Sequence, residues 1–239
     1  GSYSWLDKQT EGHDVARWLQ SEGISAYVLR YRVQGGFAFA SGIRHIVRGH
    51  QYPDAQNDLQ QAIRWLRDNA DSLGIDPNRI GVMGCSAGGH VSACVSTVAD
   101  DMASVGDSLD SVAFRPDFAI LVSPVISMSD AIVHRGSKLC LLGKDRASDK
   151  TFADRWSMEL QVNAQNPPSL MIHASDDPAV STLNSVRFYE ALMSNGVKKS
   201  SLHIFPFGKH SIAVRNQPGS TAHWPQIAED WMREIGVLK

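Results

Sequence analysis

The sequence predicts an α/β fold, in which a mostly parallel β-sheet carries helices on both faces. Short runs rich in β-branched residues alternate along the chain with longer segments whose apolar residues recur at helical spacing. The short runs are apolar at nearly every position, which is typical of parallel strands buried on both faces. A chain of 239 residues, 43% of them hydrophobic, can bury a complete core, so we expect a single domain over residues 1–239.

Local patterns predict the individual elements. Amphipathic spacing predicts helices at Asp7–Leu19, Pro53–Leu73, Val91–Ala99, Asp154–Leu160, Leu183–Asn195 and Pro225–Ile235. Short β-rich runs predict strands at Ala26–Leu29, Arg79–Met83, Phe118–Val122, Leu170–His173 and Leu202–Phe205. Pro53 opens the second helix and Gly74 closes it, because proline suits a first turn and glycine suits a left-handed C-cap.

A candidate nucleophile lies between a strand and a helix. Residues 84–89 read Gly-Cys-Ser-Ala-Gly-Gly and follow the apolar run Ile80–Met83. In a GxSxG pattern the serine lies on a strained strand-to-helix turn, and its neighbours are small because the two backbones approach closely. The pattern alone is a weak signal, but its position after a strand makes Ser86 a candidate nucleophile.

An acid and a histidine follow two later strands. Asp176 and Asp177 come after the strand that begins at Leu170, and His210 comes after the strand that begins at Leu202. The chain order Ser, Asp, His is that of the α/β-hydrolase triad, whose members lie at the carboxyl ends of parallel strands. The spacing leaves Asp176 and Asp177 both open as the acid.

The chemistry gives each of these residues a role. A neutral Ser86 is a poor nucleophile, so His210 has to take its proton and later return it to the leaving alcohol. An ionised aspartate orients the imidazole and stabilises the imidazolium. The tetrahedral oxyanion needs two amide donors, and we expect one from Ala87 and the other from a loop at the start of this sequence.

Several segments resemble bacterial esterases of the α/β-hydrolase superfamily, particularly the acetylesterases associated with xylan deacetylation. The matching segments are Gly81–His90, Asn166–His173, Ser175–Asp177 and Asn184–Leu192. The resemblance covers nearly the whole chain. It implies a cofactor-independent serine esterase that acts on short acyl esters, with an acetylated carbohydrate such as a xylan oligosaccharide as substrate. It also implies Asp177 as the acid, with Asp176 as the runner-up.

The resemblance is incomplete at the start of the sequence. Related chains run through several strands into a glycine-rich oxyanion loop before a segment like Tyr3-Ser4-Trp5-Leu6, whereas this sequence begins Gly1-Ser2-Tyr3. The resemblance therefore implies that Ser2 and Tyr3 supply the second oxyanion donor and that the usual N-terminal strands are absent. We expect an exposed sheet edge near residues 26–31, or one covered by a partner such as a second copy of the chain.

Composition argues against other partners. A formal net charge of -2 offers no basic surface for nucleic acid, and no apolar run approaches the roughly 20 residues of a membrane helix. The cysteines and histidines show no metal-ligand spacing, so we expect no metal. The compartment stays open between the cytoplasm and the periplasm or exterior, with any export signal outside this sequence.

Some conspicuous residues have a structural interpretation beside a functional one. We expect His90 to pack beneath the turn that holds Ser86, and His173 to be structural and to hydrogen-bond the acid loop. Trp5, Trp156 and Trp224 are candidates either for stacking on sugar rings or for packing.

Three functional alternatives stay open. A broad-specificity short-chain carboxylesterase or a peptidase would use the same triad on the same fold. A catalytically idle hydrolase fold used for binding would keep the residues without the activity.

Overall fold

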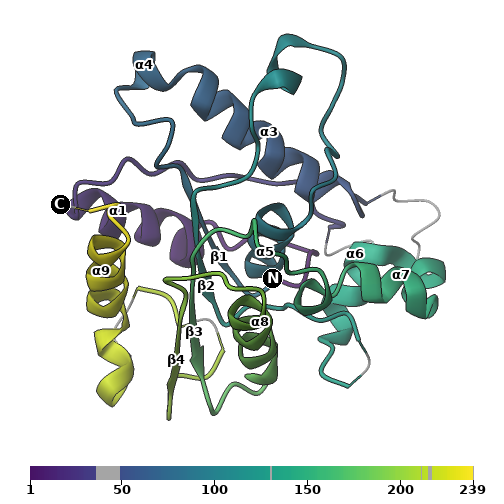
Figure 1. Cartoon of the computed structure of the whole chain (residues 1–239). Coiled ribbons are helices and arrows are strands. Elements are labelled where there is room, and N and C mark those ends of the chain that lie inside the picture. Colours follow the sequence, from purple (N-terminus) through teal and green to yellow (C-terminus); the bar gives the residue numbers. More distant parts are fainter. Residues whose placement is uncertain (36–48, 130, 211, 215–216, 239) are drawn as a thin grey trace.

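The computed structural model describes residues 1–35, 49–129, 131–210, 212–214 and 217–238, and within them a parallel sheet lies between two helical layers (Figure 1). The strands are β1 (Gly81–Cys85), β2 (Phe118–Val122), β3 (Ser169–Ala174) and β4 (Ser201–Phe205), in the order β1-β2-β3-β4. Met83 pairs with Ile120, and Ile120 pairs with Leu170. Because the strands run parallel, their carboxyl ends all lie at the same end of the sheet.

Helices connect the strands and cover the sheet. The α-helices are α1 (Asp14–Ser21), α3 (Asp54–Asp68), α4 (Ala70–Leu73), α5 (Ala87–Thr97), α6 (Arg135–Ser148), α7 (Lys150–Arg155), α8 (Leu183–Ser194) and α9 (Trp224–Glu234). The shorter helical turns are η1 (Gln9–His13), η2 (Ser108–Ser111), η3 (Met158–Leu160) and η4 (Gly219–His223). Within the described ranges, no helix has the length and apolar character that crossing a membrane requires.

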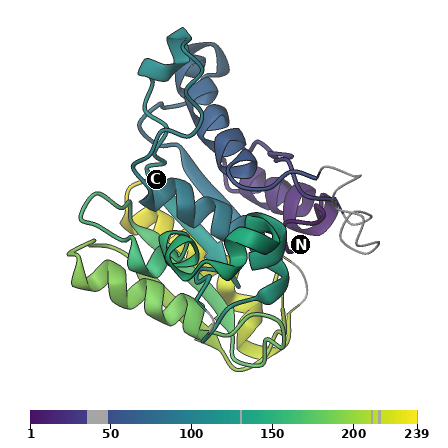
Figure 2. The ribbon, with the colours of Figure 1, turned by 90° about the vertical axis from the view of Figure 1, so that its right-hand side faces the viewer.

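The sheet separates two hydrophobic cores. Ile120 and Val122 point toward α1 and α9, while Leu121 points to the opposite face and packs with α3, α5 and α8. Figures 1 and 2 show α1 and α9 on one side of the strands and α5 and α8 on the other. Every residue of β2 is buried, and burying a side chain such as leucine or isoleucine contributes about 1.5–3 kcal/mol. The two cores therefore hold the strand ends in fixed positions.

Most of the expected elements are confirmed. The strand at Phe118–Val122 has the expected bounds, and β1 begins at Gly81 instead of Arg79. The helix expected from Pro53 is present as α3 and α4, and Gly74 ends it in the left-handed conformation, with φ 66°. These elements carry strong local signals, so tertiary contacts did not have to override them.

The strand expected at Ala26–Leu29 is wrong, because this segment is not part of the described sheet. Tyr27 is 49% exposed, and Val28 and Leu29 are 37% and 36% exposed. A strand needs a neighbour to accept and donate its backbone hydrogen bonds, and no described strand lies beside this segment. That a second copy of the chain covers this region stays a prediction.

The helix expected at Asp154–Leu160 is also wrong. The helix α7 ends at Arg155, and Ser157 is extended, with φ -94° and ψ 102°. The Ser157 hydroxyl accepts a hydrogen bond from the Met128 N–H at 2.9 Å and donates to the Ala153 carbonyl at 3.0 Å, so a tertiary contact draws the chain out of the helix. Helix α6 was not among the predicted helices, because its regular spacing is interrupted at Gly143, with φ 76°.

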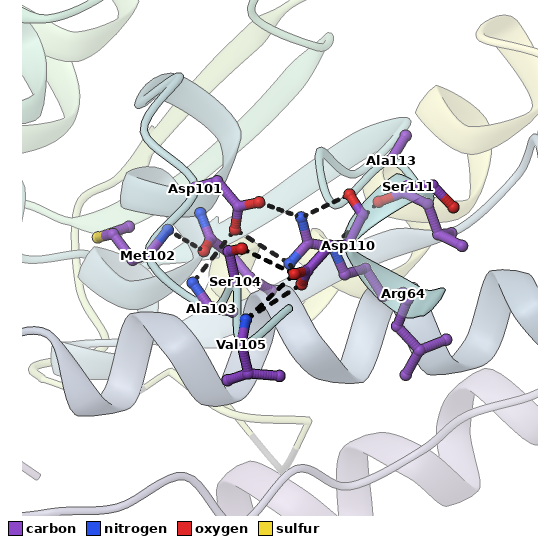
Figure 3. A network of polar contacts seen from close by, with 12 residues as sticks. Arg64, Asp101, Met102, Ala103, Ser104, Val105, Asp110, Ser111 and Ala113 are labelled. Atoms are coloured by element: carbon purple, nitrogen blue, oxygen red, sulfur yellow. Dashed lines mark hydrogen bonds and ion pairs between the residues drawn. The ribbon is translucent and has the colours of Figure 1, made fainter. Parts of the chain in front are cut away.

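A buried arginine ties the loop before β2 to α3 (Figure 3). Arg64 is 1% exposed, and its guanidinium donates to the Asp101 carboxylate at 3.0 Å and to the Val112 carbonyl at 3.0 Å. The carboxylate of Asp110 lies 3.7 Å from the same guanidinium and accepts from the Gly106 N–H at 2.7 Å. The hydrogen bond from Arg64 holds the pKa of Asp101 below its ordinary value. Charge-assisted hydrogen bonds to Arg64 therefore help to fix this loop.

We expect Arg64→Met to lower the free energy of unfolding by about 3 kcal/mol at pH 7, because the substitution leaves the loop's carboxylates and carbonyls without their donor. The lowered pKa of Asp101 means that its contribution exists above its unfolded pKa of about 3.9 and is lost as pH falls through the folded value. The difference between the two proteins should therefore shrink below about pH 4. Urea unfolding at several pH values measures it.

Arg17→Met is the matched control, because Arg17 is 68% exposed and its ion pair is with Asp14 on its own helix. We expect that substitution to cost less than about 1 kcal/mol. Equal losses in the two variants would contradict the anchoring role of Arg64.

Candidate active site

The turn between β1 and α5 holds Ser86 in a conformation that few residues adopt. Ser86 has φ 53° and ψ -118°, a strained region that is typical of functional sites. Its N–H donates to the Val122 carbonyl at 3.0 Å, and its carbonyl accepts from the Val125 N–H at 3.0 Å. These bonds to the end of β2 and the loop after it hold the strained residue in place.

The glycines beside Ser86 permit a close approach of strand and helix. A Cβ atom on Gly84 would lie 2.2 Å from the carbonyl oxygen of Gly88, which is backbone that cannot move aside. A Cβ atom on Gly89 would lie 2.7 Å from the Cβ of Pro124. A side chain at Gly84 would push α5 away from β1, and one at Gly89 would push α5 away from the loop after β2, so either would displace Ser86.

The structure brings the expected serine, histidine and aspartate together. His210 Nε2 lies 2.9 Å from Ser86 Oγ, and His210 Nδ1 lies 2.7 Å from Asp177 Oδ2. Both distances are within hydrogen-bond reach, as a nucleophile, its base and the acid require. The runner-up acid, Asp176, is exposed, and its carboxylate accepts from the Lys209 N–H at 2.8 Å instead of contacting His210. The geometry thus separates two aspartates that spacing alone left open.

The carboxylate of Asp177 is fully buried and fully hydrogen-bonded. Its Oδ1 accepts from the N–H groups of Ala179 at 2.8 Å and Val180 at 2.9 Å, and its Oδ2 lies near His173 and His210. Burial raises the pKa of Asp177, but the hydrogen bonds from these two histidines and two amides outweigh it and hold the pKa well below its usual value. The carboxylate is therefore ionised at neutral pH.

The first turn of the described chain is fastened to α5 behind the serine. Ser2 and Tyr3 both have positive φ, at 57° and 61°. The Tyr3 hydroxyl lies 2.7 Å from His90 Nδ1, and His90 Nε2 lies 2.9 Å from the Trp156 carbonyl. Since Nε2 faces a carbonyl it carries the hydrogen, and the tyrosyl hydroxyl donates to Nδ1. Burial lowers the pKa of His90 to about 4, so the ring is neutral at neutral pH.

The expected oxyanion donors belong to the two segments that the contact between Tyr3 and His90 joins. Ala87, which is 1% exposed, is the first residue of α5, where backbone N–H groups point toward the helix N-terminus. Ser2 and Tyr3 belong to the turn that Tyr3 fastens to His90. Donation to an oxyanion by any of these amides stays a prediction. His90 packs in the core beneath the turn, as expected.

Two histidines near the acid were not assigned to the site from the sequence. His173 Nε2 lies 3.2 Å from Asp177 Oδ2, which confirms the expected contact with the acid loop. His134 caps α6 by accepting from the Ser137 N–H. Burial first, and then the nearby His210, lower the pKa of His134. His134 lies in no recognisable motif, so only the spatial arrangement reveals that it lies near His210 and Asp177. For His173, the sequence predicted the contact with the acid loop, and the structure adds its partner atoms.

The candidate sugar-stacking residues divide between surface and core. Trp156 and Trp224 are fully buried, so they pack and do not line a cleft, whereas Trp5 is 62% exposed. Trp5 borders a surface hollow of about 500 Å³ whose other lining residues are Leu6, Asp7, Lys8, Gln9 and His13. A second hollow of about 510 Å³ lies beside the acid loop and is lined in part by Arg135, Asp177 and Thr182. Within the described ranges, no group of histidine, cysteine, aspartate and glutamate side chains could hold a metal ion.

Comparison with known families identifies related proteins. A family model described as BD-FAE matches residues 17–192. The chain is 34% identical to an acetylxylan esterase of Xylanibacter ruminicola over 100% of this chain and 45% of that protein. It is 30% identical to endo-1,4-beta-xylanase B of Butyrivibrio fibrisolvens over 86% of this chain and 30% of that protein. The chain thus spans less than half the length of these curated relatives.

Solved structures are similar over the whole chain. The acetyl ester-xyloside bifunctional hydrolase from Caldicellulosiruptor lactoaceticus matches with a TM-score of 0.86 and 35% identity, over 100% of this chain and 81% of that one. The carboxylesterase Cest-2923 from Lactobacillus plantarum WCFS1 matches with a TM-score of 0.76 and 24% identity, over 100% of this chain and 84% of that one. The expected α/β-hydrolase fold and the resemblance to its esterases are confirmed.

We expect Asp177→Asn to lower kcat for 4-nitrophenyl acetate by about 10⁴-fold, because an amide in place of the carboxylate favours the wrong imidazole tautomer. Asp176→Asn is the matched control and should stay within about threefold of the wild type, since the exposed Asp176 bonds the Lys209 N–H and not His210. Steady-state kinetics of both variants measure the difference. A loss confined to Asp176→Asn would make the runner-up the acid.

Proposed function

We propose that this chain, which belongs to the BD-FAE family, is a serine esterase that hydrolyses short acyl esters, acetyl esters above all, through an acyl-enzyme. The observation that carries the proposal is the continuous hydrogen-bonded path from Ser86 through His210 to Asp177. The path crosses three loops at the carboxyl ends of parallel strands, where α/β sheets carry their reactive groups. The names of the relatives support the same class of reaction.

The first half of the proposed reaction acylates the enzyme. Ser86 Oγ attacks the ester carbonyl carbon while His210 Nε2 takes the hydroxyl proton, and Asp177 stabilises the imidazolium that forms. The N–H of Ala87 and an N–H of the Ser2–Tyr3 turn donate to the oxyanion of the tetrahedral intermediate. When the intermediate collapses, the alcohol leaves with the proton from His210 and the acyl group stays on Ser86.

The second half releases the acid. Water attacks the acyl carbonyl while His210 takes a proton from it, and the same amides donate to the second oxyanion. Collapse of this intermediate returns the proton to Ser86 Oγ and frees the carboxylic acid. The ionised Asp177 supports the imidazolium in both halves, so its low pKa matters to acylation and to deacylation.

Ser86→Ala tests the proposed activity. We expect kcat for 4-nitrophenyl acetate to fall by at least about 10⁴-fold, because the substitution removes the hydroxyl that His210 activates. Ser108→Ala, at an exposed serine of η2, is the control and should leave the rate unchanged. An equal, low rate in wild type, Ser86→Ala and Ser108→Ala would favour the catalytically idle alternative.

We also propose that the alcohol part of the substrate is an acetylated carbohydrate. One relative is named an acetylxylan esterase, and one related structure is named an acetyl ester-xyloside bifunctional hydrolase. Trp5 supports this substrate class, because an exposed indole beside polar side chains offers a face for a sugar ring and partners for its hydroxyls. The N–H groups of Ser4 and Trp5 bond the Gly1 carbonyl, so Trp5 closes the same turn that carries Ser2 and Tyr3.

We expect Trp5→Ala to raise KM for acetylated xylo-oligosaccharides about fivefold, which corresponds to the loss of about 1 kcal/mol of aromatic contact. KM for 4-nitrophenyl acetate should stay unchanged. Trp65→Ala removes another exposed indole, 48% exposed on α3, and is the control. Acetate release from the oligosaccharides measures the rate. Faster cleavage of butyryl than of acetyl esters, with no acetate released from any sugar, would support the broad-specificity carboxylesterase instead.

A further inference from the structure

A second buried histidine contacts the acid of the proposed triad. His173 lies in β3, is fully buried, and places Nε2 3.2 Å from Asp177 Oδ2 and 3.0 Å from the Val180 carbonyl. Its other ring nitrogen, Nδ1, lies 2.8 Å from the Ser185 hydroxyl on α8. Strand, acid loop and helix therefore meet at one imidazole.

The partners of the ring identify its tautomer. Nε2 faces a carboxylate and a carbonyl, which are both acceptors, so it carries a hydrogen and shares it between them. The Ser185 hydroxyl can then donate to Nδ1, which leaves neither ring nitrogen without a partner. A ring flip would place the ring carbons against these polar groups, so the orientation of His173 is fixed.

Asp177 is consequently held between two imidazoles. Its Oδ2 accepts from His173 and from His210, while its Oδ1 accepts from the turn amides of Ala179 and Val180. Both backbone groups of Val180 are held: its carbonyl accepts from His173, and its N–H donates to Asp177. Rotation of the carboxylate away from His210 would break contacts with both His173 and the turn.

We propose that His173 is a positioning residue of the reaction: it fixes the Asp177 carboxylate in the orientation in which Oδ2 meets His210. The inference rests on the proposed function of Ser86, Asp177 and His210. In this role His173 holds the acid without contacting Ser86. Misplacement of a reacting group by about 1 Å costs on the order of 100-fold in rate, so such a role is measurable.

The hydrogen bond from His173 also affects protonation. It lowers the pKa of Asp177, and its removal therefore raises that pKa. The charged or titratable groups nearest to this pair in the described ranges include His134, before α6, and Arg135, which lines the same hollow as Asp177. Asp176 and Lys209 are their sequence neighbours, and the Asp176 carboxylate turns to the Lys209 N–H. When the carboxylate binds protons more strongly, the Asp177–His210 pair takes up its proton at a higher pH. The enzyme then loses half of its activity at a higher pH on acidification.

Three variants test the proposal. His173→Leu removes the N–H donor and fills the same space with an apolar side chain. We expect kcat to fall about 10- to 100-fold and KM to stay within twofold of the wild type. We also expect the acid limb of the kcat/KM profile to move to higher pH. His173→Gln keeps a side-chain N–H donor and should recover kcat to within about fivefold of the wild type. Ser185→Ala removes the partner of Nδ1 and should lower kcat about threefold.

His203→Leu is the matched control. His203 lies on the neighbouring strand β4, in register with Ile172, and its Nε2 contacts Ser201 instead of the acid loop. We expect it to leave kcat and the pH profile unchanged. Rates are normalised to active sites titrated with a phosphonate ester, and circular dichroism checks that each variant is folded.

The outcomes are distinct. A folded His173→Leu protein with wild-type kcat and an unmoved acid limb overturns the proposal. If His173→Leu does not fold, Ser185→Ala decides, and a wild-type kcat together with a wild-type pH profile in that variant overturns it. Full activity in Ser86→Ala would instead overturn the proposed function, whatever the His173 variants show.

Discussion

The close approach of β1 and α5 is the constraint on which the candidate site depends. Gly84 lets the two backbones pass at a distance that a Cβ atom would forbid, and Gly89 does the same between α5 and Pro124 in the loop after β2. Ser86, between β1 and α5, takes a strained conformation. Such a conformation costs of order 1–3 kcal/mol and persists only where the surroundings hold it. The surroundings here are the core itself, because nearly every residue of α5 is buried between the sheet and its neighbouring helices.

The parallel sheet brings the strained Ser86 close to the other residues of the candidate site. Ser86 follows β1, while the loops that carry Asp177 and His210 follow β3 and β4, so the strand order determines which loops can meet. Backbone hydrogen bonds continue the ladder beyond the strands: the Ser86 N–H donates to Val122, and the Ser175 N–H donates to Phe205 at 2.7 Å. The loops therefore leave the sheet in fixed directions, and their polar side chains converge within hydrogen-bond distance.

Three buried polar side chains, Asp177, Arg64 and His90, fix the positions of the loops, and each has more than one hydrogen-bond partner. The charge of Asp177 is offset by two imidazoles and two amides, and the charge of Arg64 is offset by carboxylates and carbonyls. His90, by contrast, is kept neutral by burial and connects Tyr3 to the helix behind Ser86. Burial of such groups is costly unless they are paired, so these contacts tolerate few other arrangements of the loops.

The sequence by itself determined the elements whose signals are local. The continuous apolar runs predicted β2, β3 and β4 to within a residue or two, and the GxSxG pattern after a strand predicted the turn at Ser86. The chain order of serine, acid and histidine predicted which loops carry the site. These features depend on short stretches of chain, and so they can be recognised without knowing what lies beside them in space.

Only the tertiary structure decided the features that depend on a neighbour. Residues 26–29 have the composition of a strand but no described strand beside them, and Ser157 leaves a helix to bond Met128. Asp176 and Asp177 are adjacent and chemically identical, yet only Asp177 faces His210. Likewise, Trp156 is buried while Trp5 is exposed. Hydrogen bonding and burial between distant segments separate these cases, and neither is encoded in local spacing.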